Sequence, residues 1–119
     1  GNADFVRSIQ RANPDGSLSF FCAIDRGIVF KVAHGEDLLA NLDTALVDAG
    51  TQVGEVALTL GCDCILRRLE CRERGITEQV GQRLAHSRVI GFSTFGEQYR
   101  GMHINQTFTG ITFGRRARS

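Results

Sequence analysis

Apolar residues follow two different spacings along this chain of 119 residues, and the alternation of these spacings is the feature that most constrains the fold. Where every second residue is apolar, the pattern predicts a strand with one buried side. Where apolar residues recur every three or four positions, it predicts an amphipathic helix. Strands are predicted within residues 17–24, 28–34, 55–60, 88–93 and 107–113, and helices over residues 35–49 and 65–84. The order β-β-α-β-α-β-β predicts an α+β fold, with a mixed, mostly antiparallel sheet of about five strands and two main helices.

Local signals set the expected boundaries of these elements. Asp25-Arg26-Gly27 is a hairpin-type break, so we expect residues 17–34 to form one antiparallel hairpin. Two acidic residues open the first helix, and Gly50 is expected to end it. Gly75 interrupts the second helical stretch. Residues 94–106 have the glycine-rich, aromatic and polar composition that is typical of a loop.

The composition is that of one globular domain. The small net charge and the lack of a long apolar run predict no binding to nucleic acid or membrane. The 14 basic and 13 acidic residues leave a net charge of +1, too small for an electrostatic footprint. No apolar run reaches the ~18 residues of a membrane span. Residues 1–3 are interpreted as a cloning scar, residues 4–114 as the domain and residues 115–119 as a solvated basic tail. Because the only methionine is Met102, we expect the chain to be a piece of a longer protein.

Cys62, Cys64 and Cys71 are the first candidates for metal chemistry. On a strand, positions 62 and 64 point to the same face, so both thiols could ligate one zinc or iron ion, with Cys71 as the third ligand. A helix that begins at Cys64 would instead separate it from Cys71 by about 10 Å, which is too far for a shared ion. Two interpretations stay open: a cysteine-ligated metal site, structural or redox-sensing, and the reduced structural thiols of a cytosolic protein.

The segment from residue 96 to residue 107 concentrates side chains suited to ligand binding. Loops that gather such groups often carry function, although the same groups could serve only to satisfy the loop's own backbone. The candidate ligand-binding residues are His103, Glu97, Tyr99, Asn105 and Gln106. The common phosphate-binding, dinucleotide-binding, nucleophile-elbow and zinc-protease motifs are all missing from the sequence. We therefore expect a binding module and not an enzyme.

Two segments near the C-terminus carry a resemblance to a known family. Gly91-Phe92-Ser93-Thr94-Phe95-Gly96-Glu97 and His103-Ile104-Asn105-Gln106-Thr107-Phe108-Thr109 resemble the end of the C-terminal part of the FIST domain, and weaker similarity covers residues 4–114. The resemblance implies a cytoplasmic, bacterial sensor module that binds a small-molecule ligand. Its implied partners are a sensor histidine kinase, a cyclic-dinucleotide enzyme or another signalling output protein, together with the N-terminal half of the FIST domain.

Within that family, the chain is most similar to the haem-binding nitric-oxide sensors. The Cys62-Asp63-Cys64 segment and the loop that leads to His103 carry this likeness. A haem sensor needs one axial ligand and an open sixth site in an apolar pocket, so the resemblance implies His103 as the ligand, with Met102 beside it. Four aromatic residues are candidates either for pocket walls or for the ordinary core, which is the commoner role of aromatic side chains: Phe92, Phe95, Phe108 and Phe113.

Overall fold

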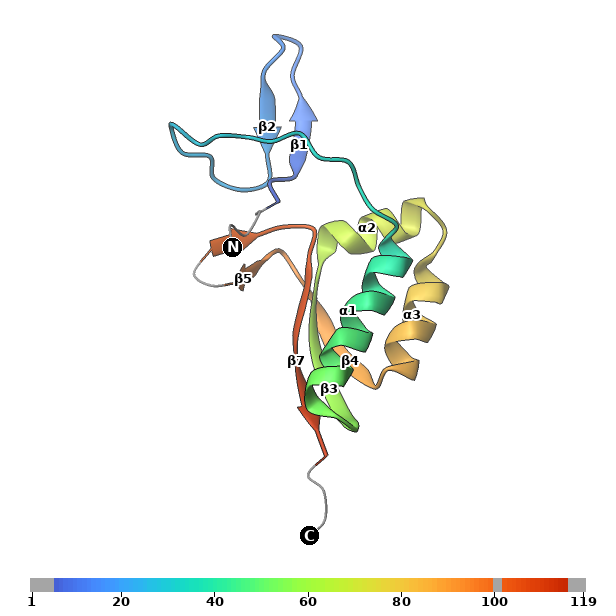
Figure 1. The fold of residues 1–119 in the computed structure, drawn as a ribbon. Coiled ribbons are helices and arrows are strands. Elements are labelled where there is room, and N and C mark those ends of the chain that lie inside the picture. The colour runs from blue at the N-terminus through green and yellow to red at the C-terminus, as the bar shows by residue number, and fades with distance from the viewer. Residues whose placement is uncertain (1–5, 100–101, 116–119) are drawn as a thin grey trace.

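The computed structural model describes residues 6–99 and 102–115, without the side chains of Tyr99 and Met102. Strands and helices alternate along this part of the chain, as Figure 1 shows. The elements are β1 (Ile9–Ala12), β2 (Leu18–Phe20), α1 (Leu38–Val53), β3 (Val56–Cys64), α2 (Ile65–Glu73), α3 (Thr77–His86), β4 (Val89–Thr94), β5 (Glu97–Tyr99), β6 (Met102–Ile104) and β7 (Phe108–Gly114).

Strands β4, β3 and β7 form the central sheet, with β3 in the middle. β3 pairs with β4 in parallel and with β7 in antiparallel orientation. A parallel pair needs a crossover connection, and α2 and α3 provide it between β3 and β4. The β1–β2 and β5–β6 hairpins complete the described strands. The predicted α+β class with mixed pairing is confirmed, and its strands are divided between one three-stranded sheet and two hairpins.

The helices cover one face of the central sheet, which we call the helix face (Figure 1). α1 and α3 lie along this face, and α2 begins where β3 ends. The buried centre of the core consists of Leu38, Leu42, Cys71 and Val80. Half-buried apolar side chains from both the helices and the sheet surround this centre. The opposite side of the sheet, which we call the outer face, has no described helix over it in Figure 1.

Three glycines cross the helix face in one row. Gly61 of β3 lies opposite Gly91 of β4 and Gly110 of β7. A Cβ atom at Gly91 would lie only 1.8 Å from the carbonyl oxygen of Gly61, and one at Gly61 would lie 2.7 Å from the ring of Phe108. The row therefore allows neighbouring backbone and the Phe108 ring to come closer than any side chain would permit.

Helix α1 confirms the first predicted helix, but it begins at Leu38, so the two acidic residues precede its first turn. The Asp37 side chain caps its start by accepting a hydrogen bond from the Ala40 N–H at 2.7 Å. The helix passes the expected stop at Gly50 and ends at Val53, where Gly54 takes a φ of 77°. Gly50 lies inside the helix, where an added Cβ would make an ordinary contact of 3.5 Å with the nearest methyl of Val56.

The predicted hairpin over residues 17–34 is wrong. β2 pairs with β1, and residues 28–32 form no strand in the described structure. The turn between β1 and β2 is held by Asp15, whose carboxylate accepts bonds from the Ser17 hydroxyl at 2.7 Å and the Ser17 N–H at 2.9 Å. These bonds lower the pKa of Asp15. The competing turn at residues 25–27 has one backbone contact of 3.5 Å, which is too long to hold a hairpin.

Two further expectations concern the C-terminal half. The second helical stretch is divided as predicted, because Gly75 adopts a φ of 68° between α2 and α3. The strand predicted over residues 107–113 is confirmed as β7. The loop predicted over residues 94–106 is wrong, since this segment folds into the β5–β6 hairpin. Among the described residues of this segment, Gly96 lies in the short break between β4 and β5.

Candidate functional site

The predicted ligand segment leaves the central sheet at the end of β4, forms the β5–β6 hairpin and returns as β7. Glu97 closes the base of this hairpin. The hydroxyl of Thr94 donates to one oxygen of its carboxylate, and the hydroxyl of Thr107 donates to the other at 2.6 Å. Glu97 is buried, and hydrogen bonds to a charged acceptor are among the stronger ones. The carboxylate therefore joins the chain leaving the sheet to the chain returning to it.

Asn105 is the most buried polar residue in the described chain, with 1% of its surface exposed. Its Oδ1 atom has no hydrogen-bond partner among the described residues. An unsatisfied buried acceptor costs about 1–3 kcal/mol, so such an atom in a folded protein calls for an explanation. A bound molecule that donates a hydrogen bond provides one.

Gly96 makes room for the two side chains nearest to it. It adopts a φ of 136°. A Cβ atom here would lie 2.2 Å from Nε2 of His103 and 3.0 Å from Nδ2 of Asn105. Only glycine accommodates both the backbone angle and the contacts. The imidazole and the amide are therefore brought to the same α-carbon.

Gln106 connects the hairpin base to two other parts of the chain. Its Oε1 atom accepts a hydrogen bond from the Ser8 hydroxyl at 3.1 Å, and its Nε2 atom donates to the Glu70 carboxylate of α2 at 2.9 Å. The carbonyl oxygen of His103 accepts a bond from the Arg7 guanidinium at 3.0 Å. These contacts link the site to α2 and to the segment before β1.

An ion pair lies beside Glu97 at the end of β3. The Nε atom of Arg67 donates to the Asp63 carboxylate at 2.7 Å, and its guanidinium lies 6.0 Å from the centroid of the Phe108 ring. Burial raises the pKa of Asp63, the charge of Arg67 lowers it, and the charge of Glu97 raises it further. The site thus lies at the carboxyl ends of two parallel strands, where open sheets with helices commonly bind ligands.

A family model decides what kind of domain this is. The model of the FIST C domain matches residues 1–100, which include every element from β1 to β5. The chain belongs to the FIST C domain family. This family comprises small-ligand sensing domains of signalling proteins. No curated protein and no solved structure matches the chain. The family match includes Glu97 and ends before His103, so the later part of the site depends on geometry.

The five predicted ligand residues of this FIST C domain differ in their positions. Glu97 and Asn105 are buried at the hairpin base. His103 is exposed, with its ring edge against the glycine at position 96. Gln106 is exposed and joins the hairpin to α2. The side chain of Tyr99 lies outside the described residues. The four predicted residues whose side chains are described therefore lie close together at the base of the hairpin.

The cysteines of the FIST C domain are free thiols. Cys64 ends β3 and Cys71 belongs to the buried core, whereas Cys62 is half-buried and points toward the outer face. Burial raises the pKa of the Cys71 thiol. Among residues 6–99 and 102–115, no group of three His, Cys, Asp or Glu side chains is placed to hold a metal ion. The alternative of a zinc or iron site at these cysteines gains no support from the geometry.

The described residues do not fit a haem at His103. The Nε2 atom that would have to bind iron faces the α-carbon of Gly96. The four candidate wall residues do not gather at His103: Phe92 and Phe108 border one small hollow beside Gly61 and Gly91, and Phe95 and Phe113 are exposed. No apolar pocket surrounds the imidazole in the described chain.

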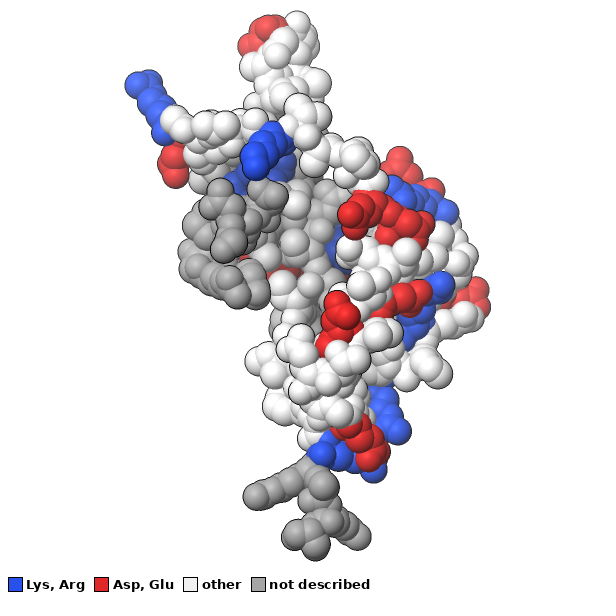
Figure 2. Space-filling view, viewed as in Figure 1, with Lys and Arg blue, Asp and Glu red and all other residues white. Residues whose placement is uncertain are grey.

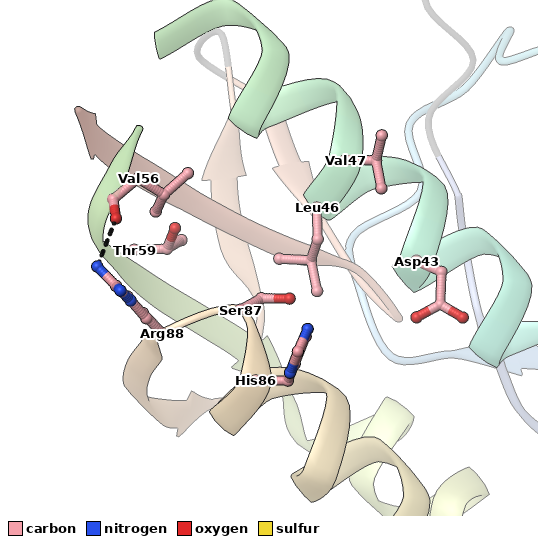
Figure 3. Close-up of a pocket in the computed structure, with 8 residues that line it drawn as sticks. All are labelled: Asp43, Leu46, Val47, Val56, Thr59, His86, Ser87 and Arg88. Carbon is pink, nitrogen blue, oxygen red and sulfur yellow. Dashed lines mark hydrogen bonds between the residues drawn. The ribbon is translucent and has the colours of Figure 1, made fainter. Parts of the chain in front are cut away.

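Two hollows lie away from the hairpin base. The first, of about 450 Å³, lies between α1, the start of β3 and the turn from α3 to β4 (Figure 3). In Figure 3 the Arg88 guanidinium is turned to the Val56 carbonyl oxygen, to which it donates at 3.0 Å. The second, of about 290 Å³, lies over the glycine row beside α3. Neither hollow is lined by a predicted ligand residue.

Sequence reasoning missed the residues that organise the site. Thr94 and Thr107 hold Glu97, and Ser8 and Glu70 hold Gln106. One local signal was present, because a Thr three residues before a Glu is a common spacing for a side-chain bond across a turn. The other contacts join positions up to 98 residues apart, and no local pattern reveals them.

Proposed function

We propose that this FIST C domain senses a small polar molecule at the base of the β5–β6 hairpin. The ligand donates a hydrogen bond to Oδ1 of Asn105. The observation that carries the proposal is that this buried oxygen has no partner among the described residues. The exposed His103 imidazole next to the same glycine supplies a second polar contact at the rim.

Ligand binding favours one position of the hairpin relative to the rest of the domain. A ligand shifts such an equilibrium by its difference in affinity for the two states. Gln106 and the His103 carbonyl tie the hairpin to α2 and to the segment before β1. A change at Asn105 therefore reaches both segments through hydrogen bonds that already exist.

We also propose which kind of signalling protein the domain regulates. We place the domain in the cytoplasm as a non-enzymatic regulator of a sensor histidine kinase, a cyclic-dinucleotide enzyme or another output protein, in agreement with its family. None of the helices among the described residues combines the length and the apolar character that a bilayer crossing requires.

Haem and nitric oxide are the alternative ligands within this proposal. The likeness of the sequence to haem-binding members of the family supports them. The orientation of His103 toward Gly96 supports a polar ligand instead. Haem added to the protein would give an intense Soret absorption that depends on His103 if the alternative holds.

The test is a nuclear magnetic resonance titration of the whole chain. Small donor molecules, acetamide and methylguanidinium, are added one at a time, and haemin is added in a separate experiment. We expect a donor to shift the Asn105 side-chain amide and the backbone amides of Gly96 and His103. The substitution Asn105→Leu should weaken binding roughly tenfold to a hundredfold, because one buried hydrogen bond is lost.

Matched histidine variants locate the response. His103→Ala should weaken binding, whereas His34→Ala and His86→Ala should leave it unchanged. His86 lines the 450 Å³ hollow at the other end of the sheet. Shifts that cluster around His86 and disappear in His86→Ala would contradict the proposed site and assign ligand binding to that hollow.

A further inference from the structure

The outer face of the central sheet carries large apolar side chains with no described helix over them. Five such side chains are between 40% and 62% exposed: Leu60 of β3, Ile90 and Phe92 of β4, and Ile111 and Phe113 of β7. Leu60 lies directly opposite both Ile90 and Ile111. Paired residues of neighbouring strands point to the same face, so these side chains form one continuous patch.

The exposed apolar area of this patch is large for a monomeric protein. Side chains of this size at these exposed fractions present on the order of 100 Å² each, so the five expose roughly 500 Å². This value lies in the upper range for the largest apolar patch on a monomer. A stable interface buries about 800 Å² per partner with an apolar centre and a polar rim. The patch is thus large enough to be the centre of such an interface.

The strands themselves place no charged side chain on the outer face, and the buried Glu97 carboxylate lies only at its end, against Thr94. Among the described residues of β3, β4 and β7, those that point to this face are apolar, threonine or cysteine. The only charged residue within these strands, Asp63, points to the helix face and pairs with Arg67. In Figure 2 the charged side chains gather over the helices and at the ends of the molecule.

We propose that the outer face binds a second copy of this chain. In a two-fold dimer the same patch meets itself, and an uncharged patch does so without bringing like charges together. The two outer faces pack about 10 Å apart, as in sheet-on-sheet sandwiches. The helices then cover both outsides of the dimer. This inference goes beyond the proposed sensing function and does not depend on it, because no residue of the hairpin base takes part.

Sedimentation equilibrium of the whole chain tests the proposal. Measurements from about 1 to about 100 μM bracket the micromolar dissociation constants of weak interfaces. We expect the mass to rise from the 13.0 kDa of one chain toward twice that value. A protein that stays at the mass of one chain throughout this range overturns the proposal.

Two lysine substitutions with matched exposure locate the interface. Ile111 is 62% exposed on the outer face, and Val47 is 63% exposed on α1, on the helix side. Ile111→Lys should raise the dissociation constant at least about thirtyfold, because a charge is placed in the apolar patch twice in a symmetric dimer. Val47→Lys should leave the constant unchanged. Dimers that survive Ile111→Lys, or that are lost in Val47→Lys, overturn the proposal.

Alkylation of the unmodified chain gives a readout that does not depend on a variant. Cys62 points to the outer face and is half-buried, whereas Cys22 is half-buried in the segment after β2. With iodoacetamide in excess, the rate at Cys62 should fall as the protein concentration rises, and the rate at Cys22 should stay constant. A rate at Cys62 that does not depend on protein concentration contradicts an interface on this face.

Discussion

The two faces of the central sheet reverse the usual relation between side-chain size and burial. On the helix face, the buried Thr59 bonds through its hydroxyl to Thr112 at 3.0 Å, and the neighbouring position is Gly61. On the outer face, the adjacent positions hold Leu60 and Ile111, both exposed. At the middle of the sheet, the covered face therefore carries small residues beside the Phe108 ring, and the open face carries large apolar ones.

This difference indicates that the side chains of the two faces are suited to different neighbours. Small residues on the helix face let the Phe108 ring and the neighbouring backbone come close to the sheet. Large β-branched and aromatic residues fit a sheet surface that another layer covers. Substitutions on the helix face should therefore change the stability of one chain, and substitutions on the outer face should change the association of two.

The largest effect should come from the glycine row. Gly91→Ala would place Cβ 1.8 Å from the Gly61 carbonyl oxygen, so the backbone of two paired strands must move. We expect a loss of about 3 kcal/mol or more in the free energy of unfolding, measured by urea denaturation. Ile90→Ala, one position away on the outer face, is the control. At a concentration where the chain is monomeric, it should cost less than about 1 kcal/mol.

The next effect tests the charged group on the helix face. Asp63→Ala leaves the buried Arg67 guanidinium without its carboxylate. We expect a loss of about 1–3 kcal/mol in unfolding free energy, since an unpaired buried charge is costly. Glu55→Ala breaks the exposed pair with Arg115 and should cost no more than about 0.5 kcal/mol. Equal losses in both variants would mean that Arg67 remains well solvated.

A smaller effect concerns the outer face alone. If this face binds a second chain, the melting temperature depends on protein concentration, because dissociation accompanies unfolding. We expect a rise of roughly 2–4 °C for each tenfold increase in concentration. Ile111→Ser should remove this dependence and leave the melting temperature at low concentration nearly unchanged. Differential scanning calorimetry at several concentrations measures both.

The smallest effect is the pH dependence of Asp63. Burial raises the pKa of this carboxyl above its ordinary value of 3.8, so the folded protein holds its proton more tightly than the unfolded chain. Its contribution to stability is complete below pH 3.8 and is lost as the pH rises through the raised folded pKa. Asp63→Asn should remove this loss, with a slope of at most ~1.4 kcal/mol per pH unit for one proton. Urea denaturation between pH 3 and pH 7 compares the two proteins.

Much of the fold could be predicted because its signals are local. Leu38, Leu42 and Leu46 recur at helical spacing, and the first two are the buried residues of α1. The alternation in β7 likewise predicted a strand where one exists. Residues 28–32 have a similar alternation yet form no strand, because a strand also needs a neighbour to satisfy its backbone hydrogen bonds.

The candidate site was predictable in location more than in detail. The cluster of polar residue types between residues 96 and 107 pointed to the hairpin base. It did not show that the Glu97 carboxylate is already bonded to two hydroxyls, or that Asn105 is the residue left with a free acceptor. Hydrogen-bond satisfaction depends on which distant groups the fold brings within about 3 Å, and residue type alone does not contain it.

The sequence by itself determined the class of elements, most of their positions and the family, because periodicity and local motifs act over a few residues. The tertiary structure decided which face of each strand is covered. The pleat of β3 places Leu60 and Gly61 on opposite sides, and only the arrangement of α1 and α3 makes one side a core and the other a surface. Burial follows from packing between distant segments, so the role of an apolar residue is settled only by what lies above it.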